Sequence, residues 1–323
     1  MLLDDRKAAI LAAVVETYIE TGVPVSSSTV LERSRVGVSP ATVRNDLAVL
    51  EREGYAVQPH TSAGRVPTSA AYRYYVDHLS PEEVKSTTRD QIHAFMSSVH
   101  MELGRLLKAT SALLADVTHY PAVVLGPGLA GEAITGLHLI PVSSRAVLVV
   151  LVGGSGQVRQ QVVSFDEPID PKEVEAAEAC LVEAIESGGL DDVVVDGPER
   201  VQRIVDRAVA AATRLDDDRE LYVGGTSALA STWQDIAEVN RVLEVLEREA
   251  MLLRVLAGAN AGTLIAIGEE HPIGGDVSVV STDYNLGGVG GRVGVIGPQR
   301  MDYRRTISVV EEVSEVLEGL LEP

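Results

Sequence analysis

The sequence predicts an α+β protein of two or three domains, and three observations support this class. Amphipathic helical patterns dominate the first 80 residues, with a strand-like run among them. Runs rich in Val, Leu and Ile then predict two groups of strands, at 121–125, 134–142, 145–152 and 157–165, and again at 263–267, 277–284 and 289–296. Helical patterns fill most of the interval between the groups, so a mostly helical insertion at about 166–230 is expected.

The first 79 residues predict a compact unit of helices followed by a short strand and loop. The first helix spans about 5–21, and a second begins at Ser26 or Ser27 and ends near Leu31. Ser39 is placed to cap a third helix over about 40–53, with a proline at its first position. A strand at 55–59, a loop at 60–65 and a fourth helix, capped by Thr68, follow. This order is typical of a winged helix-turn-helix.

The third helix has two different faces. Val43, Leu47 and Leu50 share one side, which is expected to pack on the first two helices. The residues that cap the helix or lie opposite and beside this stripe are Ser39, Ala41, Thr42, Arg44, Asn45, Ala48 and Arg52. Alanine permits close approach to DNA, Asn pairs with adenine and Arg with guanine, so these residues are candidates for major-groove contact. An ordinary solvated helix face is the alternative, but the preceding helices and the following strand and loop favour DNA binding.

The loop after the strand contains polar side chains suited to the DNA backbone. His60, Thr61, Ser62 and Arg65 could present hydroxyl, imidazole and guanidinium groups to phosphates or to a minor groove. The plainer alternative is a simple hairpin connection.

The net charge of −20 is unfavourable for binding DNA, but the acidic residues are unevenly distributed along the chain. Residues 1–79 have 8 basic and 9 acidic side chains, whereas the rest of the chain has 19 and 38. No run is long and apolar enough for a membrane helix, and the N-terminus lacks the pattern of a signal peptide, so a cytoplasmic protein without membrane contact is expected. One cysteine and scattered histidines suggest neither a metal site nor a catalytic set. No enzyme activity and no cofactor are expected.

A heptad-like apolar seam runs from Ile92 to Val117 in a long helical stretch. It could join two chains in a coiled coil. Packing on the chain's own sheet is the favoured interpretation, because three or so heptads are the least that supports a coiled coil.

Several separated blocks of the sequence resemble one known family. VGVSPATVRNDLAVLEREGY at 36–55, QPHTSAGRVPTSAAYRYYVDHL at 58–79 and ELYVGGTSALA at 220–230 are similar to the HrcA family of heat-inducible transcription repressors. One departure is Ser69-Ala70-Ala71, where a glycine would be expected before Tyr72.

The resemblance implies a DNA-binding domain at 1–79, a GAF-like domain at 80–165 plus 231–323, and an inserted dimerising domain at 166–230. It also implies a homodimer that binds double-stranded DNA at the inverted-repeat operator CIRCE before chaperone operons, with repression assisted by the GroEL chaperonin and relieved on heat stress. Two alternatives are weighed beside it. One is a regulator whose GAF-like domain senses a small molecule, and the other is an enzyme with a DNA-binding head, for which no catalytic set is recognised.

Overall fold

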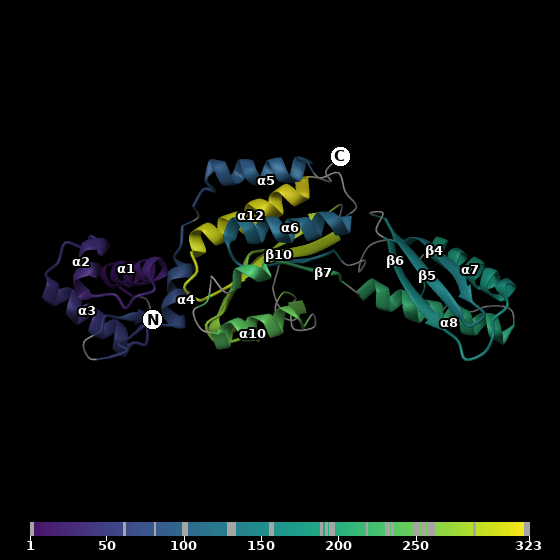
Figure 1. The fold of residues 1–323 in the computed structure, drawn as a ribbon, viewed down its shortest axis with the longest axis horizontal. Helices are drawn as coiled ribbons and strands as arrows, with labels where there is room; N and C mark the ends of the chain where they lie inside the picture. The colour runs from purple at the N-terminus through teal and green to yellow at the C-terminus, as the bar shows by residue number, and fades with distance from the viewer. Residues whose placement is uncertain are drawn as a thin grey trace.

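The computed structural model of the 323-residue chain describes residues 3–60, 63–80, 82–98, 103–127, 134–154, 158–187, 190, 193, 198–217, 219–229, 233, 236–248, 252–253, 256, 262–286 and 289–319. Three bodies follow one another along an elongated molecule (Figure 1). We call them the head, the body and the inserted domain. The mixed α+β class expected from the sequence is confirmed.

The head consists of three helices and a small sheet. The helices are α1 (Asp5–Thr21), α2 (Ser27–Ser34) and α3 (Pro40–Arg52), each begun by a side chain that accepts a backbone N–H. Strands β1 (Ala56–Val57) and β2 (Val66–Pro67) are antiparallel, and an isolated bridge from Val25 to Arg65 extends the pair. Helices followed by a small sheet agree with the expected winged helix-turn-helix.

Helix α4 (Ser69–Asp77) joins the head to the body. Its Ser69 hydroxyl donates to Gln299 Oε1 over 2.9 Å, and Arg73 Nη1 donates to the carbonyl of Ile265 over 2.8 Å. The rings of Tyr72 and Tyr303 lie 6.1 Å apart. One continuous hydrophobic core therefore runs from the head into the body.

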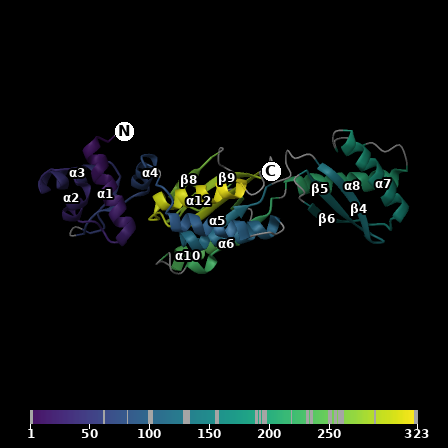
Figure 2. The ribbon, with the colours of Figure 1, turned by 90° about the horizontal axis from the view of Figure 1, so that it is seen from above.

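The body is built on a five-stranded antiparallel sheet in the order β7-β3-β10-β9-β8. Its strands are β3 (Ala122–Leu125), β7 (Leu221–Gly224), β8 (Leu264–Ile267), β9 (Ser278–Leu286) and β10 (Val289–Gly297). Helices α6 (Leu103–Thr118) and α12 (Tyr303–Gly319) pack on one face, and α5 (Ser86–Ser98) lies against α12, as Figure 2 shows from above. Helix α10 (Ile236–Leu246) covers the other face, and the short helices η1 (Thr226–Ala228) and η2 (Gly268–Glu270) complete the described elements of the body.

The apolar seam between residues 92 and 117 belongs to the core of the body. It is divided between α5 and α6, where Ile92, Met96, Leu113 and Val117 are buried against the chain's own residues. Thr110, which interrupts the seam, is also buried and donates its hydroxyl hydrogen to the carbonyl of Leu106. The favoured interpretation, packing within the chain, is confirmed for the described part of the seam, whose buried side chains are not available to join two chains; residues 99–102 of the seam lie outside the described residues.

The inserted domain differs from the prediction in both limits and composition. Strands β4 (Ile134–Ser143), β5 (Ala146–Gly153) and β6 (Val158–Ser164) do not join the body sheet but form a separate antiparallel sheet. Helices α7 (Pro171–Glu186) and α8 (Glu199–Asp217) pack on it, with a core of their own. The insertion thus extends over about 134–217 rather than 166–230, and it is α/β rather than mostly helical. Strands that neighbour one another along the chain pair with one another, and the apolar faces of α7 and α8 cover that pair of hairpins.

Among the described helices, none is long and apolar enough to cross a bilayer.

Candidate DNA-binding surface

Helix α3 is fixed to the head at its N-terminus and along one side. Ser39 Oγ accepts the backbone N–H of Thr42 over 3.2 Å and lies 2.9 Å from the Thr42 hydroxyl. Val43, Leu47 and Leu50 are buried in the core with residues of α1 and α2. The cap and the apolar stripe are therefore placed as the sequence predicts.

The opposite side of α3 is open to solvent. Ala41, Arg44, Asn45, Ala48 and Arg52 are all exposed, and Thr42 is half-buried beside them. The small side chains of Ala41 and Ala48 lie among two guanidinium groups and an amide, so the helix can approach a groove of DNA closely. Six of the predicted contact residues, the five exposed ones and Thr42, are thus brought together on or beside one helical face.

A half-buried ion pair fixes the orientation of this face, and the sequence prediction did not include it. Asp46, buried on α3, accepts hydrogen bonds from Arg6 of α1, with Nε–Oδ2 at 2.8 Å and Nη2–Oδ1 at 3.3 Å. The hydrogen bond to Asp46 raises the pKa of the Arg6 guanidinium above its ordinary value. Two parallel bonds fix direction as well as distance, so rotation of α3 relative to α1 is restricted. The signal in the sequence was an aspartate directly beside the apolar stripe.

The wing, which consists of β1, β2 and the loop between them, is closed by short contacts with the backbone. Gln58 Nε2 donates to the carbonyl of Ala63 over 2.9 Å, across the loop that joins β1 and β2. A Cβ on Gly64 would lie 2.4 Å from the carbonyl oxygen of Val25, so this position has no space for a side chain. His60 is exposed on the loop, whereas the predicted contacts Thr61 and Ser62 lie outside the described residues.

Arg65 has two attachments within the head. Its backbone N–H and carbonyl each form a 2.8 Å hydrogen bond with Val25, just before α2. Its side chain is only 17% exposed, and Nη2 lies 2.8 Å from Glu51 Oε2 on α3. Arg65 therefore connects the wing to the base of the exposed helix, instead of projecting freely from the loop.

Two further arginines of the head lie at the end of α2 and in the segment before α3. Arg33 pairs with Glu20 at 2.5 Å, and Arg35 is exposed in a left-handed conformation with φ of 52° between α2 and α3. Together with Arg44 and Arg52 they place positive charge on a head whose total charge is nearly zero. Such a local distribution attracts phosphate despite an acidic chain.

The body and the inserted domain contain no candidate metal site in the described part of the chain. There, no three His, Cys, Asp or Glu side chains gather as metal ligands would. His271 is buried, but its ring bonds to the backbone at Val277 and Ile273, which is a structural role.

The chain is similar to known proteins over its full length. The model of the family described as HrcA protein C terminal domain matches residues 104–307. A relative from Kineococcus radiotolerans, named heat-inducible transcription repressor HrcA, is 37% identical over 98% of this chain and 99% of its own. A relative of the same name from Acidothermus cellulolyticus is 38% identical over 99% of both chains. A solved structure described as a hypothetical protein superposes with a TM-score of 0.60 at 25% identity, covering 99% of this chain and 100% of that one.

Proposed function

The chain belongs to the HrcA family of heat-inducible transcription repressors, and from this premise we propose that it represses chaperone operons as a homodimer bound to the inverted-repeat CIRCE operator. Membership in a repressor family confirms the expectation that the protein is not an enzyme. The proposal has three parts, which are the contacts that read the operator, the surface that joins two chains, and the step that releases repression on heat stress.

The exposed face of α3 carries the proposal. Asn45 and Arg44 lie in the first two turns of a helix whose other side is buried and whose rotation is restricted by the Arg6–Asp46 pair. Residues in the first turns of such a helix reach base edges when it enters a major groove. We assign sequence readout to Arg44, Asn45 and Arg52, close approach to Ala41 and Ala48, and phosphate contact to Ser39, Thr42 and the wing residues His60, Thr61, Ser62 and Arg65.

The inserted domain supplies a surface suited to dimerisation. One face of its sheet packs on α7 and α8, and the other has no cover among the described residues. On that open face Leu148 lies between Ile140 and Val162 in register, and these two flanking side chains are 49% and 54% exposed. A contiguous apolar face of this kind favours association, and a two-fold dimer matches the symmetry of an inverted repeat.

The release of repression is proposed to depend on folding state rather than on a cofactor. The family resemblance supports a GAF-like body and assistance by the GroEL chaperonin, which would return heat-damaged repressor to its DNA-competent form. On heat stress, unfolded clients would occupy the chaperonin and the active fraction of repressor would fall. All of this takes place in the cytoplasm, where chaperone operons are transcribed.

A gel-shift titration on a CIRCE duplex tests the proposal. Repressor is heated, divided, and titrated with and without chaperonin and ATP at two salt concentrations, beside a duplex of scrambled sequence. We expect a higher active fraction after chaperonin treatment, and tighter binding to CIRCE than to the scrambled duplex. Equal active fractions would contradict the chaperonin step, and equal affinity for both duplexes would contradict operator binding.

A further inference from the structure

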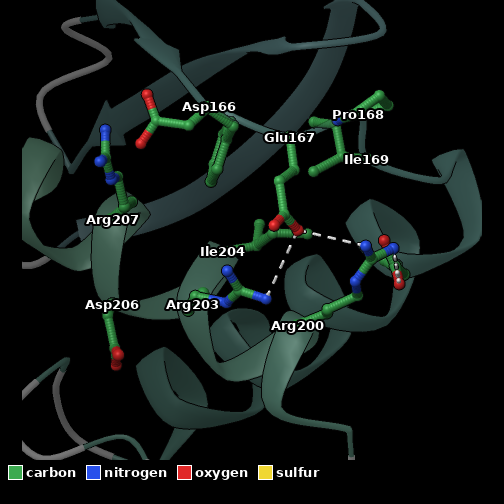
Figure 3. Close-up of a pocket in the computed structure, with 11 residues that line it drawn as sticks. Asp166, Glu167, Pro168, Ile169, Arg200, Arg203, Ile204, Asp206 and Arg207 are labelled. Atoms are coloured by element: carbon green, nitrogen blue, oxygen red, sulfur yellow. Dashed lines mark hydrogen bonds and ion pairs between the residues drawn. The ribbon is translucent and has the colours of Figure 1, made fainter.

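The inserted domain contains a cavity of about 410 Å³ that the proposed repressor function does not use. It lies between the loop that follows β6 and the first half of α8 (Figure 3). Phe165, Ile169 and Ile204 supply apolar walls, and three arginines of α8 line it together with four carboxylates. The volume falls in the range of about 300–1,000 Å³ that is usual for small-molecule sites.

The three arginines are unusual in their surroundings. Residues 134–217 contain 15 acidic and 7 basic side chains, yet Arg200, Arg203 and Arg207 all line this one cavity. Their spacing of three and four residues places them along one face of α8, where like charges destabilise a helix. Carboxylates of the chain, Asp166, Glu167, Glu173 and Asp206, line the cavity beside them, and Arg200 also lies 3.8 Å from Glu173. The grouped guanidinium groups thus form a site at which carboxylate oxygens are already held.

A carboxylate of the chain itself lies where such an anion would bind. Glu167 points between two guanidinium groups, with its Oε2 3.2 Å from Arg200 Nη2 and 4.0 Å from Arg203 Nη2 (Figure 3). Arg200 and Arg203 are 53% and 55% exposed, so these contacts are weak and exchange with solvent readily. Glu167 thus marks an anion position that an external carboxylate or phosphate could take over.

Arg207 is held in place at the opposite end of the cavity. Its Nη1 donates to the carbonyl of Ser164 over 2.7 Å, and its guanidinium lies 5.7 Å from the centre of the Phe165 ring. This leaves an aromatic ring and a fixed cation beside the apolar side chains. The body of a ligand would rest here while its charged group lay between Arg200 and Arg203.

We propose that this cavity binds an amphipathic anion, a small molecule with a carboxylate or phosphate attached to an apolar body about the size of one ring. The anion displaces Glu167 and forms bidentate hydrogen bonds with Arg200 and Arg203, as guanidinium groups do with planar oxyanions. The site lies in the inserted domain, outside the body in which the alternative sensor function would place a ligand.

Isothermal titration calorimetry of the full chain tests the site with three probes: phenyl phosphate, benzoate and inorganic phosphate. We expect phenyl phosphate and benzoate to bind more tightly than inorganic phosphate, because only they bury apolar surface. Arg203→Gln should weaken phenyl phosphate binding roughly tenfold or more, since a charge-assisted hydrogen bond is lost. Glu167→Gln should strengthen it, because the internal competitor loses its charge. Arg248→Gln, which removes an exposed arginine just after α10 in the body, should leave it unchanged.

Arg203→Gln and Glu167→Gln are expected to change phenyl phosphate affinity in opposite directions. This distinguishes a role in ligand binding from a role in stabilising the domain, for which both substitutions would lower affinity. Circular dichroism must first show that each variant is folded, and Arg203→Lys replaces Arg203→Gln if the latter is not. The proposal is overturned if no probe binds at millimolar concentration, if Arg203 variants bind as the wild type does, or if Glu167→Gln weakens binding as Arg203→Gln does. It is also overturned if inorganic phosphate binds as tightly as phenyl phosphate.

Discussion

The guanidinium of Arg65 and the carboxylate of Glu51 lie 2.8 Å apart, and through them the wing contacts the last turn of α3. Arg65 Nε is buried and has no acceptor among the described residues. The guanidinium of Arg65 therefore uses only part of its hydrogen-bonding capacity within the described head. A phosphate could replace Glu51 as its partner, because both offer a charged oxygen and phosphate accepts the same planar donor.

Substitution of Glu51 and Arg65 should alter DNA affinity in opposite directions. Glu51→Gln should release Arg65 and raise affinity for operator and random DNA alike. Arg65→Ala should weaken both and flatten the salt dependence by about one unit per affected site, because one phosphate contact is lost. Fluorescence anisotropy over a series of salt concentrations measures both effects.

The double variant decides whether the two residues act through their contact. If Glu51→Gln raises affinity only when Arg65 is present, the carboxylate acts by holding the arginine. An equal gain in the Arg65→Ala background would mean that Glu51 merely repels phosphate.

Gly64→Ala should destabilise the wing. The new methyl group would lie 2.4 Å from the carbonyl oxygen of Val25 and 2.7 Å from the carbonyl carbon of Pro24, both backbone atoms that can move little. Overpacking of this kind costs about 1–3 kcal/mol. Urea unfolding measures the loss, and Gly290→Ala is the matched control, since its methyl group would meet no atom within 4 Å. Equal stability of both variants would show that the contact between the wing and the segment before α2 relaxes freely.

The sequence predicted the head more accurately than the insertion, because the patterns that identify the elements of the head involve residues close together in the chain. Ser26, Ser39 and Thr68 each cap the helix expected after them, because capping depends on residues only two or three positions apart. Runs rich in Val, Leu and Ile likewise identified β4, β5 and β6 as strands. Such a run does not reveal which sheet a strand joins, so the strands were assigned to the body instead of to the insertion.

Contacts between distant residues were the part of the site that could not be predicted. The face of α3 follows from helical spacing, and its exposed residues were identified correctly as exposed. The Arg6–Asp46 pair joins residues 40 apart, and the Arg65–Glu51 pair depends on the path of the wing. Neither distance is encoded in a local pattern. Whether the exposed residues contact DNA remains a prediction.

Stability should fall in mild acid because of His271. Burial is the main cause that lowers the pKa of this imidazole, and Nδ1 accepts the N–H of Ile273 while Nε2 lies 3.0 Å from the Val277 carbonyl, which suits the neutral ring. The unfolded chain therefore takes up a proton near pH 6.5, before the folded protein does. The contribution of His271 is fully present above that pH and is lost as pH falls toward the folded-state pKa. Urea unfolding between pH 7 and 5 should show a shallower decline for His271→Gln, and equal slopes would contradict this role.

Charges on the open sheet face should separate the proposed dimer. Ile140→Lys with Val162→Lys places two cations beside Leu148, where an apolar partner surface is expected. Association should weaken on the order of tenfold or more, because each buried lysine would lose its hydration without gaining a partner. Light scattering of the full chain at micromolar concentration gives the mass, with Ala179→Lys on exposed α7 surface as control. A wild-type monomer, or a double variant that still dimerises fully, would contradict the proposed interface.

Asn45→Ala should remove sequence readout while leaving general DNA affinity nearly intact. Asn45 is exposed in the second turn of α3, between Ala41 and Ala48, where its amide can form two hydrogen bonds with an adenine edge. Their loss should cost about 1–3 kcal/mol on CIRCE, whereas random DNA offers no fixed base to this side chain. Anisotropy on both duplexes at one salt concentration measures the difference. Asn240→Ala, an exposed asparagine of α10 in the body, should change neither affinity. If Asn45→Ala weakened binding to CIRCE and to random DNA equally, α3 would not be the reading helix, and the proposed orientation of the head on DNA would have to be abandoned.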